Sequence, residues 1–123
     1  MPKILIADDE PETLELLSHA LRLGGYEVDG ARNGEELLEK IESSSPDLII
    51  LDVMMPGMDG WDTIRAINDA GLGEHVLIVM LTATDVPGKK MIGLQEFVFD
   101  YITKPFEPDE LVSKVRQISD YLH

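Results

Sequence analysis

The chain has 123 residues, 44% of them hydrophobic, which predicts one compact domain spanning residues 1–123. Its 24 acidic and 10 basic residues give a net charge of −14, which argues against direct binding of nucleic acid or of an anionic membrane surface. Without cysteine, disulfides and thiolate metal sites are excluded, and no apolar run approaches the ~20 residues that span a bilayer. We therefore expect a cytoplasmic protein with neither nucleic acid nor membrane as a partner.

Short apolar runs alternate with longer segments of helical period, which predicts βα units around a parallel sheet. A first strand is expected at Lys3 to Ala7, followed by a helix that begins near Pro11 and ends at Gly24 and Gly25. The next strand, residues 26–31, is more weakly apolar, which predicts a position at the edge of the sheet. A second helix follows it, capped by Asn33.

The second half of the chain continues the same alternation. Leu48 to Leu51 and Val76 to Leu81 are continuous apolar runs, as expected of central strands that helices cover on both faces. Trp61 to Ala70 is expected to form the helix between them, and Val98 to Thr103 and Glu107 to Leu122 the last strand and helix. These units predict an α/β fold of the flavodoxin-like doubly wound (βα)5 type, with strand order 2-1-3-4-5.

The segment before the last strand has a less regular pattern. Pro87, Gly88 and Gly93 weaken helix propensity, so we expect the fourth helix to be short or mobile. Phe97 and Phe99 follow it. Two interpretations stay open for these rings: burial against neighbouring helices, which we favour, or an apolar patch beside the functional site.

Four of the five strands end in chemically active side chains. Asp8 and Asp9 follow the first strand, Asp52 ends the third, Thr82 follows the fourth and Lys104 follows the fifth. Ligands of doubly wound sheets bind beyond the carboxyl ends of the strands, and the first and third strands are neighbours in the flavodoxin-like order. Clustered carboxylates need a counter-charge, and oxygen ligands favour Mg²⁺.

Each of these residues also has an ordinary structural interpretation when it is taken alone. Asp8 and Asp9 are suited to capping the first helix, and Asp52 precedes a loop that is rich in turn-forming residues. Thr82 is suited to the end of a strand, and Lys104 to a solvated position. Their order along successive strands is what favours a common site.

A set of motifs carries a family resemblance over essentially the whole chain. The motifs are Asp8-Asp9, Asp52 followed by Met55-Pro56-Gly57-Met58-Asp59-Gly60, Leu81-Thr82-Ala83, and Tyr101-Ile102-Thr103-Lys104-Pro105-Phe106. Together they resemble the receiver domain of two-component response regulators. This resemblance implies that Asp52 is the phosphoacceptor. It also implies that Asp9, Asp52 and the backbone carbonyl of Met54 bind Mg²⁺, with Asp8 acting mainly from behind these ligands.

The resemblance also assigns roles to residues of the last two strands. Lys104 would pair with a phosphoryl oxygen, and Thr82 would donate a hydrogen bond to another oxygen. A cis Lys104-Pro105 bond, as in the resembling family, would aim the lysine inward, but the sequence leaves the isomer open. Tyr101 would change rotamer as Thr82 moves, so that the two form a switch.

The implied phosphoryl donor is a sensor histidine kinase, a phosphotransfer protein or a small acyl phosphate, and the output partner or domain is unknown. The resemblance also implies a homodimer on phosphorylation. Its interface would comprise the helix around residues 87–93, the strand at 98–103 and the helix at 107–122. In this interpretation the chain catalyses only its own aspartyl phosphorylation and dephosphorylation.

Three other classes were compared with this interpretation. A phosphatase of the haloacid dehalogenase type needs an acid two residues after its nucleophile, where this chain has Met54. A flavodoxin-like cofactor binder needs hydroxyl and glycine donors after the first strand, whereas residues 8–10 are all acidic. A receiver that has lost phosphorylation and serves only for docking stays open as the minority alternative.

Overall fold

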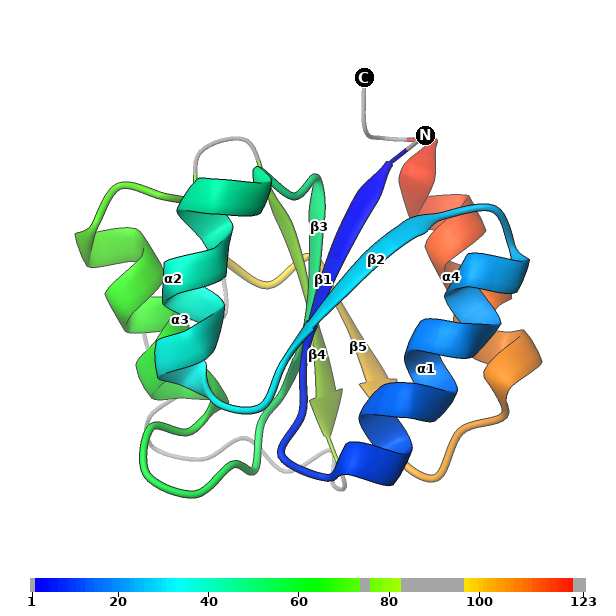
Figure 1. Cartoon of the computed structure of the whole chain (residues 1–123), viewed down its shortest axis with the longest axis horizontal. Helices are drawn as coiled ribbons and strands as arrows, with labels where there is room; N and C mark the ends of the chain where they lie inside the picture. The colour runs from blue at the N-terminus through cyan, green and yellow to red at the C-terminus, as the bar shows by residue number, and fades with distance from the viewer. Residues whose placement is uncertain (1, 74–75, 83–96, 121–123) are drawn as a thin grey trace.

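The computed structural model describes residues 2–73, 76–82 and 97–120. A parallel sheet of order β2-β1-β3-β4-β5 lies between two pairs of helices, with α2 and α3 on one face and α1 and α4 on the other (Figure 1). The predicted flavodoxin-like topology and strand order are confirmed. The elements are β1 (Lys3–Ala7), α1 (Pro11–Leu23), β2 (Glu27–Ala31), α2 (Gly34–Ser44), β3 (Leu48–Asp52), α3 (Gly60–Asp69), β4 (Leu77–Thr82), β5 (Asp100–Thr103) and α4 (Pro108–Ser119).

The central strands are hydrophobic throughout because helices cover both faces of the sheet. Every residue of β3 is buried, and alternate residues point to opposite faces. Leu5 and Ile49 belong to the core that α2 and α3 complete, whereas Ile4 and Ile50 belong to the core beneath α1 and α4. By contrast, β2 is only partly buried and lies at an edge, as its weaker apolar pattern predicted.

Helix boundaries follow from local capping chemistry. The Asn33 side chain accepts a hydrogen bond from the N–H of Glu36, so the predicted cap of α2 is confirmed. At α3, Asp59 and Asp62 bond each other's backbone N–H groups in a capping box, which starts the helix at Gly60 rather than at the predicted Trp61. Among the described residues, no helix is long and apolar enough to cross a bilayer.

The last strand is shorter than predicted, beginning at Asp100 rather than at Val98. Val98 packs against the core beside α2 and α3 from outside the strand, and Phe97 does the same. Phe99 donates its N–H to the carbonyl of Ile78 at 2.7 Å, but its side chain is 43% exposed. Phe97 is thus partly buried and Phe99 is exposed, so the favoured burial of both rings is only partly correct. Phe99 borders a cavity of about 400 Å³ with Phe97 and the end of α3. The expected helix around residues 87–93 lies outside the described residues.

Candidate functional site

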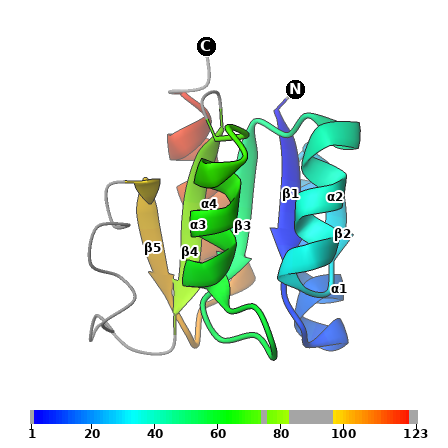
Figure 2. The same cartoon turned by 90° about the vertical axis from the view of Figure 1, so that its left-hand side faces the viewer.

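The carboxyl ends of the parallel strands meet at one edge of the sheet. Figure 2 shows β5, β4, β3, β1 and β2 side by side, all pointing toward the same end of the molecule. Asp52 is the last residue of β3, and Thr82 is the last residue of β4. Asp8 and Lys104 follow β1 and β5 directly. The residues predicted to share a site are thus carried to the same edge.

Asp52 is 4% exposed, and its carboxylate contacts both a backbone N–H group and a lysine. Its Oδ1 accepts a hydrogen bond from the N–H of Met54 at 3.2 Å, and its Oδ2 lies 3.2 Å from the Nζ of Lys104. The loop after β3 folds back closely, because Gly60 donates its N–H to the carbonyl of Val53. A Cβ on Gly60 would lie 2.7 Å from the carbonyl oxygen of Asp52, so only glycine fits there without movement.

Asp8 is fully buried beside Asp52. Its Oδ1 accepts a hydrogen bond from the N–H of Glu10 at 3.0 Å, and its Oδ2 lies 3.5 Å from the Nζ of Lys104. That same Oδ2 has no hydrogen-bond partner within the part of the chain that the structure describes. The N-cap of α1 is Glu10, which makes no side-chain cap bond, so helix capping does not account for the Asp8 carboxylate.

Three carboxylates converge at this edge. One carboxylate oxygen each from Asp8, Asp9 and Asp52 lies within 4.8 Å of the other two. Burial and the neighbouring Asp8 raise the pKa of Asp52 from 3.8 to about 6, although Lys104 acts in the opposite direction. Burial disfavours the charged ammonium of Lys104, but the charges of Asp52 and Asp8 outweigh it and raise the lysine pKa above its ordinary value.

A single lysine therefore does not neutralise the cluster. An all-oxygen donor set with a buried carboxylate oxygen that lacks a hydrogen bond fits a hard divalent cation. Asp8, Asp9 and Asp52 are the side chains placed to hold it. The side chain of Met54 is 71% exposed and points no donor at the cluster, so only its backbone carbonyl is relevant to the predicted metal site.

The ends of β4 and β5 are joined at the site. Lys104 donates its N–H to the carbonyl of Thr82 at 2.7 Å, and the Lys104-Pro105 peptide bond is cis, as the resemblance implied. Tyr101 packs against the core beside α2 and α3, where its phenol oxygen is buried without a hydrogen-bond partner among the described residues. Burial also raises the pKa of this phenol above its ordinary value. Ala83, which follows Thr82 in the third motif, lies outside the described residues.

Comparison with known proteins matches residues 4–116 to the model of the response regulator receiver domain. The chain belongs to this family. The receiver domain is 43% identical over 116 residues to the alkaline phosphatase synthesis transcriptional regulatory protein PhoP of Bacillus subtilis (strain 168), covering 94% of this chain and 48% of that protein. It thus spans about half the length of the curated relatives that it matches.

Solved structures extend this result to three dimensions. The receiver domain superposes on a CheY-like receiver domain protein from Methanospirillum hungatei JF-1 with a TM-score of 0.92 and 41% identity, covering 98% of this chain and 95% of the other. The response regulator TrrA of Thermotoga maritima, in complex with Mg(2+)-BeF, gives a TM-score of 0.80 and 38% identity, covering 96% and 99%. Our chain is therefore a receiver domain of a two-component response regulator, as its motifs predicted.

Sequence reasoning gave Gly60 no role of its own, although the structure packs it directly against Asp52. The available signal was its place at the end of a turn-rich loop and just after the capping residue Asp59. Trp61, the next residue, is 7% exposed and lies within the core beside α2 and α3.

Proposed function

We propose that Asp52 accepts a phosphoryl group and that Lys104 and a bound Mg²⁺ assist the transfer. The observation that carries this proposal is the buried Asp52 carboxylate, which contacts Lys104 and whose pKa is raised to about 6 by burial and Asp8. At neutral pH this carboxylate is still mostly ionised, so it needs no separate base to become a nucleophile. Its pKa is raised first by burial and then by the negative charge of Asp8, and that charge must be balanced before a phosphoryl group approaches.

The transfer itself is a displacement at phosphorus. A carboxylate oxygen of Asp52 forms the new O–P bond as the N–P bond of a phosphohistidine, or the O–P bond of an acyl phosphate, breaks. The electron pair of that broken bond stays with the leaving group. Lys104, 3.2 Å from Asp52 Oδ2, pairs with a phosphoryl oxygen and stabilises the charge that develops there. In this proposal the chain catalyses only its own phosphorylation and its own dephosphorylation, in which water attacks the phosphorus and releases inorganic phosphate and the free Asp52 carboxylate.

Asp9, Asp52 and the carbonyl of Met54 are proposed as the Mg²⁺ ligands, with Asp8 acting mainly from behind them. The bound ion would supply positive charge that offsets the carboxylates and the incoming phosphoryl oxygens. Support comes from the convergence of the three carboxylates and from the buried Oδ2 of Asp8, which has an ion pair with Lys104 but no hydrogen bond among the described residues. Asp8 and Asp9 directly follow β1, Asp52 ends β3, and Met54 lies two residues after Asp52.

Thr82 and Tyr101 are proposed as the conformational switch. The hydroxyl of Thr82 would donate a hydrogen bond to a phosphoryl oxygen on Asp52, drawing the end of β4 toward the site. The phenol oxygen of Tyr101 is buried and has no hydrogen bond to any of the described residues. Phosphate contacts that exist in only one conformer shift the equilibrium toward that conformer.

The partners follow from the direction of transfer. We propose a sensor histidine kinase or a phosphotransfer protein as the donor, in the cytoplasm, where small acyl phosphates are also made. The output partner or domain remains unidentified, and PhoP, which is about twice as long as this chain, is named as a transcriptional regulator. We also propose a phosphorylation-dependent homodimer through β5, α4 and the segment around residues 87–93. Sedimentation of the phosphorylated protein as an unchanged monomer would contradict it.

The decisive experiment is intact mass spectrometry after incubation with acetyl phosphate, with and without Mg²⁺. We expect a single phosphoryl adduct on the wild-type chain only when Mg²⁺ is present, and no adduct on Asp52→Asn. The matched control is Asp47→Asn, which changes an aspartate at the opposite end of β3 and should be phosphorylated like the wild type. Absence of an adduct with every divalent ion tested would favour the alternative of an unphosphorylated docking module.

A further inference from the structure

β2 forms one edge of the sheet, and part of its backbone points away from β1. The carbonyl of Ala31 accepts a hydrogen bond from the N–H of Asp8, so Ala31 points its backbone groups toward β1. Because residues of a parallel strand alternate in the side to which these groups point, Val28 and Gly30 present theirs to the outer side. Such an outer side is a template on which another strand can pair.

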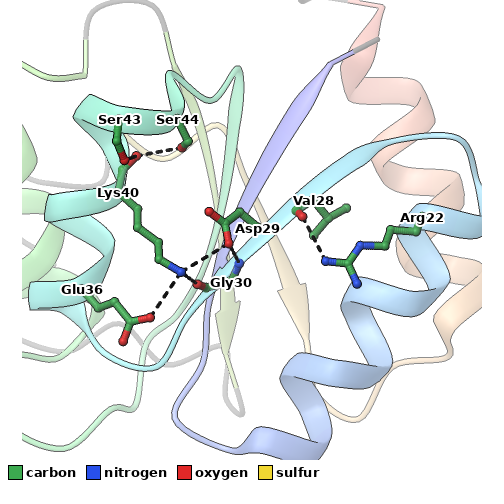
Figure 3. Close-up of polar contacts among 8 residues, drawn as sticks. All are labelled: Arg22, Val28, Asp29, Gly30, Glu36, Lys40, Ser43 and Ser44. Carbon is green, nitrogen blue, oxygen red and sulfur yellow. Dashed lines mark hydrogen bonds and ion pairs between the residues drawn. The ribbon is translucent and has the colours of Figure 1, made fainter.

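Among these outward groups, side chains bond the N–H and carbonyl of Gly30 and the carbonyl of Val28 (Figure 3). The Asp29 carboxylate accepts a hydrogen bond from the N–H of Gly30 at 2.8 Å. The ammonium of Lys40, reaching over from α2, donates to the carbonyl of Gly30 and lies 3.3 Å from the same Asp29 oxygen. From α1, on the opposite face of the sheet, the guanidinium of Arg22 donates a hydrogen bond to the carbonyl of Val28 at 3.1 Å.

The opposite edge, β5, carries the same arrangement. Lys104 donates its N–H to Thr82 on β4, so alternation along the strand turns the backbone groups of Tyr101 to the outer side. The Asp100 carboxylate accepts a hydrogen bond from the N–H of Tyr101 at 2.8 Å. Lys114 of α4 donates to the carbonyl of Tyr101 at 3.2 Å and lies 3.4 Å from the Asp100 carboxylate.

We propose that these two aspartate–lysine edge clamps close the sheet to strand addition, and that the β2 clamp, with Arg22, prevents a second copy of the chain from pairing with β2. In each clamp an aspartate binds the N–H of the next residue, and a lysine from the helix that follows the strand binds that residue's carbonyl. Two unrelated sequence segments build the same contact at the two outer strands, which argues against a chance arrangement.

The β2 edge needs this protection because its own residues offer little of it. Gly30 has no side chain to cover its backbone, so without Asp29 and Lys40 its N–H and carbonyl would be accessible to an incoming strand. Lys40 is held over this position by a second ion pair, 3.4 Å from Glu36 one turn earlier in α2. With the clamp removed, two copies related by a twofold axis would present the same edge to each other and could pair as β2 with β2.

The test is the double variant Arg22→Ala/Lys40→Ala, which removes both helix side chains and keeps good helix formers in their places. We expect sedimentation velocity to show a monomer for the wild type and a concentration-dependent dimer for the variant. The control is Arg65→Ala/Arg116→Ala, which removes the same charge from exposed positions of α3 and α4 and should stay monomeric. Because both variants increase the net negative charge equally, a dimer of the first alone is not an effect of charge.

A spin label then locates the contact. The chain contains no cysteine, so Glu27→Cys on β2 gives one attachment point. A short distance between the labels of the two copies in the dimer supports the proposal, and a long distance overturns it. A folded double variant that stays monomeric at every concentration also overturns it. Circular dichroism establishes folding. If the double variant does not fold, the single variants Lys40→Ala and Arg22→Ala decide by the same criteria.

Discussion

One aspartate directly precedes β3 and another ends it. Their side chains are identical, but their burial, hydrogen bonds and charged neighbours differ. Asp47, just before the strand, accepts a hydrogen bond from the N–H of Lys3 at 2.9 Å through its carboxylate. Its own N–H and carbonyl bond Lys3 and Leu77, so it joins β1, β3 and β4 at their amino ends. Asp52, at the carboxyl end, is buried beside Asp8 and contacts Lys104.

The difference teaches that position in the sheet, rather than residue type, decides what an aspartate does. At the amino ends of the strands a backbone N–H group satisfies the Asp47 carboxylate. At the carboxyl ends, carboxylates from two neighbouring strands face each other, and one ammonium group is left to balance them. That imbalance lowers stability, and in the function proposed above it makes phosphorylation of the Asp52 carboxylate depend on a cation.

The largest expected effect comes from removing the lysine at the carboxyl end. Lys104→Met should slow phosphorylation of Asp52 by acetyl phosphate about a hundredfold, because one stabilising charge is lost from the transition state. The rate is measured as the time course of the phosphoryl adduct by intact mass at saturating Mg²⁺. Lys3→Met, at the amino end of β1, should leave it unchanged. A wild-type rate for Lys104→Met would rule out the proposed role of this lysine.

A smaller effect is expected in the pH dependence of stability without divalent cations. The folded state raises the pKa of Asp52 from 3.8 to about 6, so the carboxylate is protonated in both states below pH 4 and ionised in both above pH 6. The stability that the raised pKa contributes is therefore present at low pH and lost as pH rises through this interval.

Urea unfolding in EDTA, followed by circular dichroism at several pH values, measures this loss. Relative to Asp52→Asn, the wild type should lose on the order of 2 kcal/mol of unfolding free energy between about pH 4 and 6. Mg²⁺ should restore most of it at neutral pH through binding to the folded state. A difference between the two proteins that does not change with pH would show that Asp52 is not electrostatically crowded.

The smallest effect is expected at the amino end. Asp47→Ala removes the acceptor for the N–H of Lys3, which should lower the free energy of unfolding by about 1 kcal/mol. The phosphorylation rate should not change, because the site lies at the other end of the sheet. The same urea and mass measurements apply. A slower phosphorylation of this variant would mean that the two ends of β3 are coupled, contrary to the comparison above.

Much of the fold follows from the sequence where packing is strongest. The apolar pattern predicts the bounds of β1 as observed and those of β3 to within one residue, because helices cover both faces of these strands. It predicts β5 two residues too long. Val98 and Phe99 have strand-like character, but their contacts with the core and with Ile78 lie outside the ladder, which residue type alone does not reveal.

The site is predictable for a different reason, since its residues come directly after strands whose order is regular. The sequence does not indicate that Lys104 forms ion pairs with both Asp8 and Asp52, because these residues come together only when the whole sheet has assembled. The two edge clamps could not be predicted from the sequence for a related reason. Lys40 and Lys114 bind backbone carbonyls, and a backbone group carries no signature in a pattern of side chains.

Trp61 gives the loop after Asp52 an optical reporter. It is the only tryptophan of the chain, it is almost fully buried, and it directly follows Gly60, which packs against the backbone of Asp52. Any rearrangement of that loop changes the surroundings of a single indole, and unfolding exposes the same indole to water. Its intrinsic emission therefore lets cation binding, phosphorylation and denaturation be followed on the unlabelled protein.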